Sequence, residues 1–594
     1  MRLARFISIR TIQRSLSAFG LLAVMAHSAA AQLTFDGNVV FQNNNSGTLP
    51  GQFVGTAGAG AASCSPGTTA ASLFSAFPHN TYADPLLPNA PYKANVIPNF
   101  QPALGSPAFG SAVAVPADGF FKQVCYKGAI GPNPGDDWTQ GWTYWDSTGA
   151  NRSDLHLTGM PNPRPLAIYQ NIDISGGQYF SPDSNYLVRG QLRVLPNGSL
   201  TVAPGVVIFE DVATLGTIIV RRGGKIFAVG NACEPIIVTP YAGNSGPVSQ
   251  ARGTCGGIYL LGRAKADGPP TDVCSGDSLA SEGGDNGYYG GNDDNDGSGI
   301  LRYVRVEFAG KERSPNNELN SFTFCGVGKN THVDYCEAFR GADDGFEWFG
   351  GSMDATHLIA IDGTDDGYDW QQGTRNRAQF VIVRVGPNFA PSGTQNGDKG
   401  VEADNTETSP YTQLTCSGRS YTQLVNVTLV GDRRFDDGSQ FPGPTSGINW
   451  RRGTAGSCLN SIITNFKTSA VKVDDDATFE ATCANPPAVP AVYCPGSAVG
   501  VGPITTGSLF VANSRPNPFR SNVNFSFTLP SAGDVSVDIF SADGRLVQTV
   551  ARGQMAAGQH SLTWKIDRDL PSGMYFYRVS AGSQSASGKI TRVD

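Results

Sequence analysis

Short apolar runs separated by Gly, Asn and Asp turns fill the middle of the chain. Here residues 343–351 (DDGFEWFGG) align with residues 365–373 (DDGYDWQQG) at an offset of 22 residues. The same frame continues in residues 398–403 and 446–450, and it extends back to residues 320–326. A frame that returns at such a period, with two or three short strands in each unit, is typical of a solenoid.

Two positions in each repeat are mostly aromatic or aliphatic and lie two residues apart. Alternate residues of a strand point to the same face, so both positions are expected to face the interior. The first column reads Phe322, Phe346, Tyr368, Val401, Ile448 and Val471. The second column reads Phe324, Trp348, Trp370, Ala403, Trp450 and Val473. The residues between them must face the other way: Thr323, Glu347, Asp369, Glu402, Asn449 and Lys472.

A second β-rich run ending in Gly precedes the frame in several repeats, as in residues 303–310 and 357–363. No 3.6-residue periodicity appears in these units, which excludes helical repeats. We therefore predict an all-β chain in which residues 166–505 form a right-handed parallel β-helix, a solenoid of the pectin-lyase-like kind. The alternative is a β-sandwich with two similar hairpins.

The flanking regions differ from this middle. Residues 513–594 alternate polar and apolar positions and contain Gly turns, which predicts a small immunoglobulin-like sandwich. Residues 32–165 are rich in Gly, Pro and Ser and are expected to form a lead-in or cap. Within that region, residues 120–130 and 138–146 look strand-like and aromatic.

The first 31 residues carry the features of an export signal. Four arginines and no acidic residue precede an apolar run at residues 16–26, and Ala29, Ala30 and Ala31 follow. A charged start, a short apolar region and a small-residue cleavage site are typical of a signal peptide, predicted here as residues 1–31. No other segment is apolar and long enough to span a membrane.

Composition narrows the class of protein further. The chain has 594 residues and a formal charge of −7, with no basic stripe, which argues against nucleic acid as a partner. Its 11 cysteines include no C-x-x-C pair, so disulfides in an oxidising compartment are favoured over zinc. Cys325 with Cys336 and Cys483 with Cys494 are the local pairs that spacing suggests.

The C-terminal motifs support a more specific assignment. They are NPF (517–519), FTLP (527–530), and the runs 535–550, 556–564 and 572–579. This region resembles the type IX secretion-system sorting domains of surface proteins from Bacteroidota and related bacteria, and it is similar to the Ig-like module of flagellar hook-capping proteins. The resemblance implies the secretion machinery as a partner. It also implies that the protein is secreted or held on the outer surface of a Gram-negative bacterium.

The middle region resembles a broad group of secreted bacterial β-helix proteins. The residues that carry the resemblance are 256–264, 289–310 and 343–351. The resemblance implies a fold and an extracellular address, but no reaction.

One turn has the composition of a calcium loop. Asn292, Asp294 and Asp296 place oxygen atoms at alternate positions before Gly297, as at the start of an EF-hand loop. The first ligand is Asn, however, and position twelve is Tyr303 where the motif has Glu. The alternatives are a calcium site, which would make Ca²⁺ the one cofactor, or an ordinary Asn/Asp/Gly turn.

The second candidate site is the acidic column Glu347, Asp369 and Glu402. Carboxylates on rungs ~4.8 Å apart repel one another and favour a bound cation or a proton. Converging carboxylates would suit Ca²⁺, a ligand or acid–base glycan chemistry. The alternative is a solvated acidic surface with no bound partner.

Motifs for catalysis are largely missing from the sequence. The G-H-G and R-I-K motifs of β-helix polygalacturonases do not occur, and only His332 and His357 fall within the solenoid. No G-x-S-x-G, H-E-x-x-H or P-loop motif is present. We therefore predict a non-enzymatic surface or extracellular protein, in adhesion, matrix or envelope structure, with glycan contact. A polysaccharide lyase or glycoside hydrolase on the same scaffold is the alternative.

Overall fold

The computed structural model describes residues 32–592 with gaps. The longest gaps are 90–97, 244–250, 268–278, 282–286, 386–398, 407–417, 432–445 and 485–509. The predicted signal peptide lies outside the described residues.

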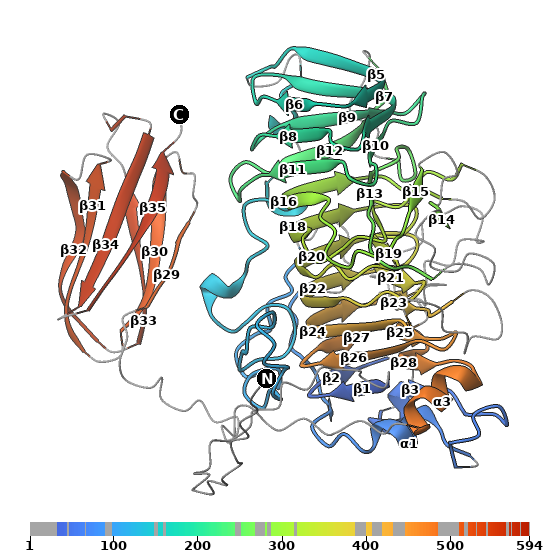
Figure 1. The fold of residues 1–594 in the computed structure, drawn as a ribbon. Helices are drawn as coiled ribbons and strands as arrows, with labels where there is room; N and C mark the ends of the chain where they lie inside the picture. Colours follow the sequence, from blue (N-terminus) through green and yellow to red (C-terminus); the bar gives the residue numbers. More distant parts are fainter. Residues whose placement is uncertain are drawn as a thin grey trace, which may run out of the picture. The chain divides into compact units, whose positions relative to one another are not determined.

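The middle of the chain forms a tall stack of parallel strands, seen from green to orange in Figure 1. Among the described residues, twenty-six strands join in one sheet and every ladder between them is parallel, which confirms the predicted parallel β-helix. The first half of the stack contains β5 (Leu166–Ile174), β6 (Gly177–Phe180), β7 (Asn185–Val194), β8 (Ser199–Val202), β9 (Val207–Asp211), β10 (Thr217–Val220), β11 (Lys225–Val229), β12 (Ile236–Tyr241), β13 (Ile258–Leu261), β16 (Gly299–Glu307) and β17 (Phe322–Cys325). The second half contains β18 (His332–Phe339), β19 (Phe346–Phe349), β20 (Ala355–Ile361), β21 (Tyr368–Gln371), β22 (Arg377–Arg384), β23 (Lys399–Ala403), β24 (Tyr421–Val430), β25 (Ser446–Trp450), β26 (Ala455–Leu459), β27 (Ile462–Thr464) and β28 (Ser469–Val473).

The members of each predicted column lie opposite one another on successive strands of the sheet. In the strand row β17-β19-β21-β23-β25-β28, Phe322 lies opposite Phe346 and Phe346 lies opposite Tyr368. The same register continues to Val471 in β28. Phe346, Trp348, Tyr368 and Trp370 are all buried in the central core, as predicted. Each coil cannot bury this apolar face alone, so stacking of coils provides the core.

The long strands bend outward at one residue per coil, which forms a second, external aromatic column. Tyr303, Tyr335, His357 and Phe380 all have φ between 50° and 59°. Their rings stack in order, with centroids 4.4, 4.2 and 5.0 Å apart. Trp138, from the N-terminal region, packs edge-on against His357 at 5.0 Å. This column therefore serves as a docking face, and His357 is part of it.

Four strands of the N-terminal region extend the same sheet beyond its last coil. They are β1 (Leu33–Asp36), β2 (Val39–Phe41), β3 (Phe53–Val54) and β4 (Thr81–Tyr82). The first three pair in parallel with β26, β27 and β28, and β4 pairs with β2. The beginning of the described chain thus closes the C-terminal end of the solenoid (Figure 1).

Three α-helices and three short 3₁₀ helices occur in the described residues. They are α1 (Ala70–Phe74), α2 (Tyr144–Ser147), α3 (Asp476–Ala484), η1 (Pro50–Gln52), η2 (Pro134–Asp136) and η4 (Ser153–Leu155). None of them is long and apolar enough to cross a membrane. β14 (Leu279–Ala280) and β15 (Tyr288–Tyr289) form a small antiparallel pair beside the solenoid.

Residues 98–147 and 153–157, here called the strap, run along the outside of the coils from the last toward the first. Val113 N donates to Asn460 Oδ1 at 2.7 Å near the last coil. Leu155 O accepts from Asn185 Nδ2 at 2.9 Å near the first. The expected strands at 120–130 and 138–146 do not form: these residues adopt bends and turns, and α2 begins at Tyr144. Their apolar side chains are buried against the solenoid instead.

A fully buried arginine holds the strap to the solenoid. Arg305 in β16 donates to the Trp142 carbonyl oxygen at 2.9 Å. It also forms ion pairs with Glu307 and Asp154, both at 2.6 Å. Since Arg305 and Glu307 are both inaccessible to solvent, removing Arg305 would take the countercharge of this ion pair away from a buried carboxylate.

The cysteine pairing differs from the local pairing that spacing suggested. Cys64 forms a disulfide with Cys483 across 419 residues, joining the N-terminal region to α3. Cys336 is a buried free thiol, so the suggested Cys325–Cys336 pair is wrong, as is the Cys483–Cys494 pair. Proximity along the sequence did not predict the disulfide, because the end of the solenoid packs against the N-terminal region.

The C-terminal region folds as two antiparallel sheets that share one core. One sheet has the order β29-β30-β33 and the other β32-β31-β34-β35. Their strands are β29 (Phe510–Arg515), β30 (Asn522–Leu529), β31 (Gly533–Ser541), β32 (Leu546–Met555), β33 (Gly558–Lys565), β34 (Gly573–Ala581) and β35 (Gln584–Arg592). A separate small β domain is therefore present, and its immunoglobulin-like topology stays a prediction.

Candidate functional site

The predicted acidic column forms on the outward side of three consecutive rungs. Glu347 lies opposite Asp369 in the β19–β21 ladder, and Asp369 lies opposite Glu402 in the β21–β23 ladder. Their exposed fractions are only 5, 8 and 8%. The column is therefore buried under other parts of the chain, which contradicts the alternative of a solvated acidic surface.

Two aspartates from the turns before β19 and β21 join this column. Carboxylate oxygens of Asp344, Glu347 and Asp369 lie within 4.8 Å of one another, as do those of Asp366, Asp369 and Glu402. These five residues are called the acidic cluster below. Asp369 belongs to both groups and so lies at the centre of the cluster.

Most members of the acidic cluster have partners supplied by the protein. Glu347 accepts hydrogen bonds from Asn320 Nδ2 and, at 3.2 Å, from Gln371 Nε2. Lys399 Nζ lies 2.9 Å from Glu402 Oε1 and 3.6 Å from Asp366 Oδ2. These contacts hold the carboxylates in fixed positions.

Two arginines from the turn after β25 border the cluster. Arg451 forms ion pairs with both Glu402 and Asp404. Arg452 lies 2.8 Å from Asp404. Burial raises the pKa of Asp404 to about 6, and the positive charge of Arg451 opposes this increase.

Asp369 is the least compensated member of the cluster. Its Oδ1 is buried and has no hydrogen-bond partner in the described part of the chain. Burial raises the pKa of Asp369 well above its usual value, and the charges of Glu402 and Asp404 raise it further. Burial and the negative charge of Asp369 likewise raise the pKa of Asp344 well above its usual value. Unless a cation is present, these carboxyl groups favour the protonated form.

The next rung adds a neutral oxygen beside the cluster. Asn449 lies opposite Glu402 in the β23–β25 ladder and is 3% exposed. Its Oδ1 also lacks a hydrogen-bond partner among the described residues. Carboxylate and amide oxygens are the ligands that Ca²⁺ prefers, so this arrangement suits a hard divalent cation.

The turn at residues 292–297 was the other candidate site. Asp294 accepts from both Lys265 N and Lys265 Nζ at 3.2 Å, so the protein supplies a cation to this carboxylate. Asp296 is 7% exposed, and burial raises its pKa. Asn292 lies on the surface, and Tyr303 belongs to the external aromatic column. Calcium binding by Asn292, Asp294 and Asp296 stays a prediction.

Sequence patterns did not reveal the basic and amide partners of the acidic column. Lys399 and Arg451 lie next to the repeat frame, three residues before Glu402 and one after Trp450. Their positions at the ends of β23 and β25 could have been noticed. Asn320 and Gln371 reach Glu347 from neighbouring coils, and no spacing rule predicts that contact.

Comparison with known protein families agrees with this architecture. A family model described as a pectate-lyase-like β-helix domain matches residues 174–492. A second model, described as a secretion-system C-terminal sorting domain, matches residues 515–592. No curated protein and no solved structure matches the chain. The sorting domain indicates secretion to the outer surface or the extracellular space through the type IX machinery.

Proposed function

We propose that this chain, which belongs to the family of pectate-lyase-like β-helix domains, is a non-enzymatic protein of adhesion, matrix or envelope structure. It would contact glycans along the outer surface of the solenoid after export through its sorting domain, and the buried acidic column would keep that surface rigid. The observation that carries this proposal is that the protein's own side chains hold Glu347 and Glu402 in place. Carboxylates fixed in this way favour a rigid, preorganised surface.

A divalent cation at the acidic cluster is part of this proposal. Five carboxylates face two cationic side chains, Lys399 and Arg451, so the cluster carries excess negative charge when it is ionised. The Oδ1 atoms of Asp369 and Asn449 have no hydrogen-bond partner among the described residues and are the positions open to a cation. Ca²⁺ is the cation that this set of oxygen donors fits best.

The second candidate function is a polysaccharide lyase or glycoside hydrolase. Burial and neighbouring carboxylates favour a proton on Asp369, while Arg451 and Lys399 form ion pairs with neighbouring Glu402. A protonated and an ionised carboxyl group side by side are the pair that glycoside hydrolysis requires. This observation makes Asp369 the residue whose replacement separates the two functions.

A binding and product assay tests the proposal. The full chain and its Asp369→Asn variant are applied to a glycan array, and the bound polysaccharides are then assayed for new reducing ends and unsaturated sugars. We expect binding without product from both proteins. Asp534→Asn, at an exposed position near the start of β31, is the matched control. Product that forms with the wild type and the control but not with Asp369→Asn would establish the enzyme instead.

A further inference from the structure

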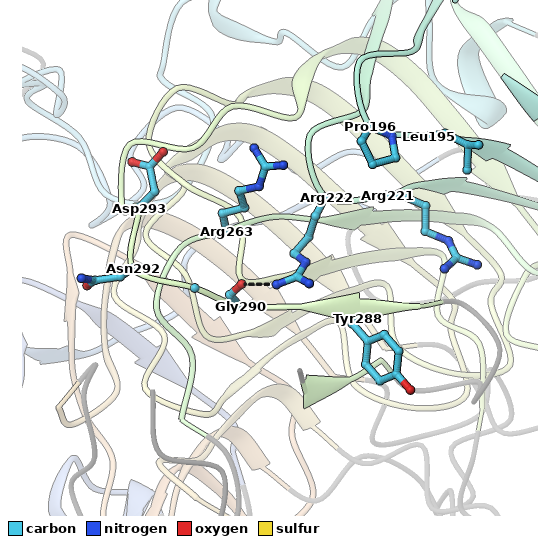
Figure 2. A pocket seen from close by; sticks show the side chains of 10 residues that line it. Leu195, Pro196, Arg221, Arg222, Arg263, Tyr288, Gly290, Asn292 and Asp293 are labelled. Carbon is cyan, nitrogen blue, oxygen red and sulfur yellow. Dashed lines mark hydrogen bonds between the residues drawn. The ribbon is translucent and has the colours of Figure 1, made fainter. Parts of the chain in front are cut away.

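A basic depression lies near the first coils, on the side where β7, β10 and β13 end. Its volume is about 570 Å³, within the range of small-ligand sites. Figure 2 shows its lining, which includes Arg221, Arg222, Arg263, Tyr288, Asn292 and Asp293. The acidic cluster contributes no residue to this lining.

The arginines come from turns on successive coils. Val220 in β10 lies opposite Val194 in β7 and Leu260 in β13, so the turns after these strands are stacked. Arg221 and Arg222 extend from one turn and Arg263 from the next. Adjacent turns are therefore ~4.8 Å apart along the stack, and the depression presents a short row of positive charge.

The local charge of this depression opposes that of the whole chain. Among the lining residues that the structure describes, three guanidinium groups face one carboxylate, Asp293, in a protein whose formal charge is −7. Arg222 is oriented by a 3.1 Å hydrogen bond to the Gly290 carbonyl oxygen. Arg263 is exposed. A concentration of positive charge in a hollow attracts anionic ligands.

An exposed aromatic ring lies beside the arginines. Tyr288 is 57% exposed and lines the same depression as Arg221 and Arg222 (Figure 2). Such a ring combines a flat apolar face with a polar hydroxyl group. Together with the arginines, it fits a ligand that has both a ring with C–H faces and an anionic substituent.

We propose that this basic depression binds a glycan whose charge is carried by sulfate or phosphate esters. One guanidinium group can occupy both oxygens of a carboxylate by bidentate pairing. An ester sulfate or phosphate has three terminal oxygens and can accept from arginines on more than one turn. The proposal concerns a different surface from the acidic cluster and does not depend on a cation there.

The test measures binding of fluorescein-labelled dextran sulfate to the full chain by fluorescence anisotropy. Arg263→Gln should weaken binding about tenfold at low ionic strength, as expected for loss of one charge-assisted interaction. Arg222→Gln with Arg263→Gln should weaken it further, and Tyr288→Ala should weaken it without changing the salt dependence. Arg552→Gln, whose side chain is 72% exposed in the C-terminal domain, is the matched control and should bind like the wild type.

Competition with unlabelled polymers tests the chemical class. At equal charge concentration, polygalacturonate should compete less well than dextran sulfate, and neutral dextran should not compete. Equal or better competition by polygalacturonate would overturn the assignment to sulfate or phosphate esters. Equal weakening by Arg263→Gln and Arg552→Gln, or no binding by the wild type at low salt, would overturn the site. Thermal unfolding of each variant should match the wild type, which separates lost binding from lost folding.

Discussion

The indole ring of Trp348 stacks on the phenol ring of Tyr368 in the next coil, with ring centroids 4.1 Å apart and planes inclined by 22°. Both side chains lie in the interior of the solenoid. Trp348→Ala should lower the free energy of unfolding by ~3–5 kcal/mol, because the vacated volume cannot be refilled by neighbouring coils. Urea denaturation followed by circular dichroism measures this change.

The matched control for that experiment is an exposed aromatic residue. Tyr288→Ala removes a ring that is 57% exposed and should change the free energy of unfolding by less than about 0.5 kcal/mol. Similar losses in the two variants would contradict the view that stacking between coils dominates the core.

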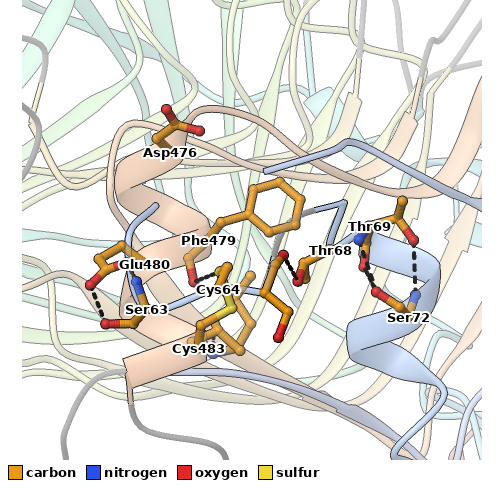
Figure 3. Close-up of a disulfide and its surroundings, with 12 residues drawn as sticks. Ser63, Cys64, Thr68, Thr69, Ser72, Asp476, Phe479, Glu480 and Cys483 are labelled. Carbon is orange, nitrogen blue, oxygen red and sulfur yellow. Dashed lines mark hydrogen bonds between the residues drawn. A yellow bond between two sulfur atoms is a disulfide. The ribbon is translucent and has the colours of Figure 1, made fainter. Parts of the chain in front are cut away.

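The disulfide between Cys64 and Cys483 secures the N-terminal region to the end of the solenoid (Figure 3). Ser63 donates hydrogen bonds to the Glu480 carboxylate beside the disulfide, so polar contacts also join the N-terminal region to α3. Cys64→Ser should destabilise the protein by ~2–5 kcal/mol, since the unfolded chain loses a long-range constraint. It should also speed proteolysis at the N-terminal region. Cys233→Ser, at an exposed free thiol, should do neither.

The buried carboxyl groups should make stability depend on pH. The pKa of Asp369 is raised in the folded state, so the folded protein binds protons more tightly than the unfolded chain. In metal-free buffer the free energy of unfolding should therefore fall as pH rises from about 4 through the raised pKa. Glu210, whose pKa burial raises to about 8, contributes in the same direction.

The Asp369→Asn variant distinguishes the contribution of the acidic cluster to this pH dependence from the contribution of Glu210. The variant should be more stable than the wild type at pH 8 by about 1–3 kcal/mol, because an amide carries no buried charge. Its stability should also vary less with pH, whereas Asp534→Asn should behave as the wild type. Urea unfolding at several pH values is the measurement, and an unchanged slope in Asp369→Asn would contradict the prediction.

Calcium should raise the free energy of unfolding by ~2.7 kcal/mol at 100 times the dissociation constant, and the melting temperature should rise with calcium concentration. If the cation binds at the acidic cluster, Asp369→Asn should remove this dependence and Asp294→Ala should retain it. If the turn at Asn292, Asp294 and Asp296 binds the cation, Asp294→Ala should remove the calcium dependence and Asp369→Asn should retain it. Identical melting curves in calcium and in chelator would rule out both sites.

Removal of residues 513–594 should leave the solenoid folded, because the C-terminal sheets have their own core. The truncated chain should accumulate in the periplasm, since it lacks the region that matches the sorting domain. Fractionation of host cells into periplasm, outer membrane and medium measures this. Surface display equal to that of the full chain would show that the domain is not needed for export.

The repeat frame could be predicted from the sequence because every coil places the same kinds of residue at the same rung. Phe346 and Tyr368 occupy equivalent positions in adjacent repeats, and a strand turns alternate side chains to the same side. The interior columns, the parallel β-helix and the acidic column all follow from this local rule. The C-terminal domain was likewise evident from its alternation and motifs.

Only the tertiary structure decided how distant segments meet. The pairing of Leu33 with Gly456, and the disulfide of Cys64 with Cys483, depend on the path of the whole chain and on no local period. The same holds for Arg451, whose contact with Glu402 needs two coils to be stacked. Two segments of the strap, residues 120–130 and 138–146, look strand-like in sequence because they are rich in aromatic residues. Their apolar side chains pack against the solenoid instead of forming a ladder. Hydrophobic pattern determines which residues leave water, whereas the partner that covers them is set by long-range packing.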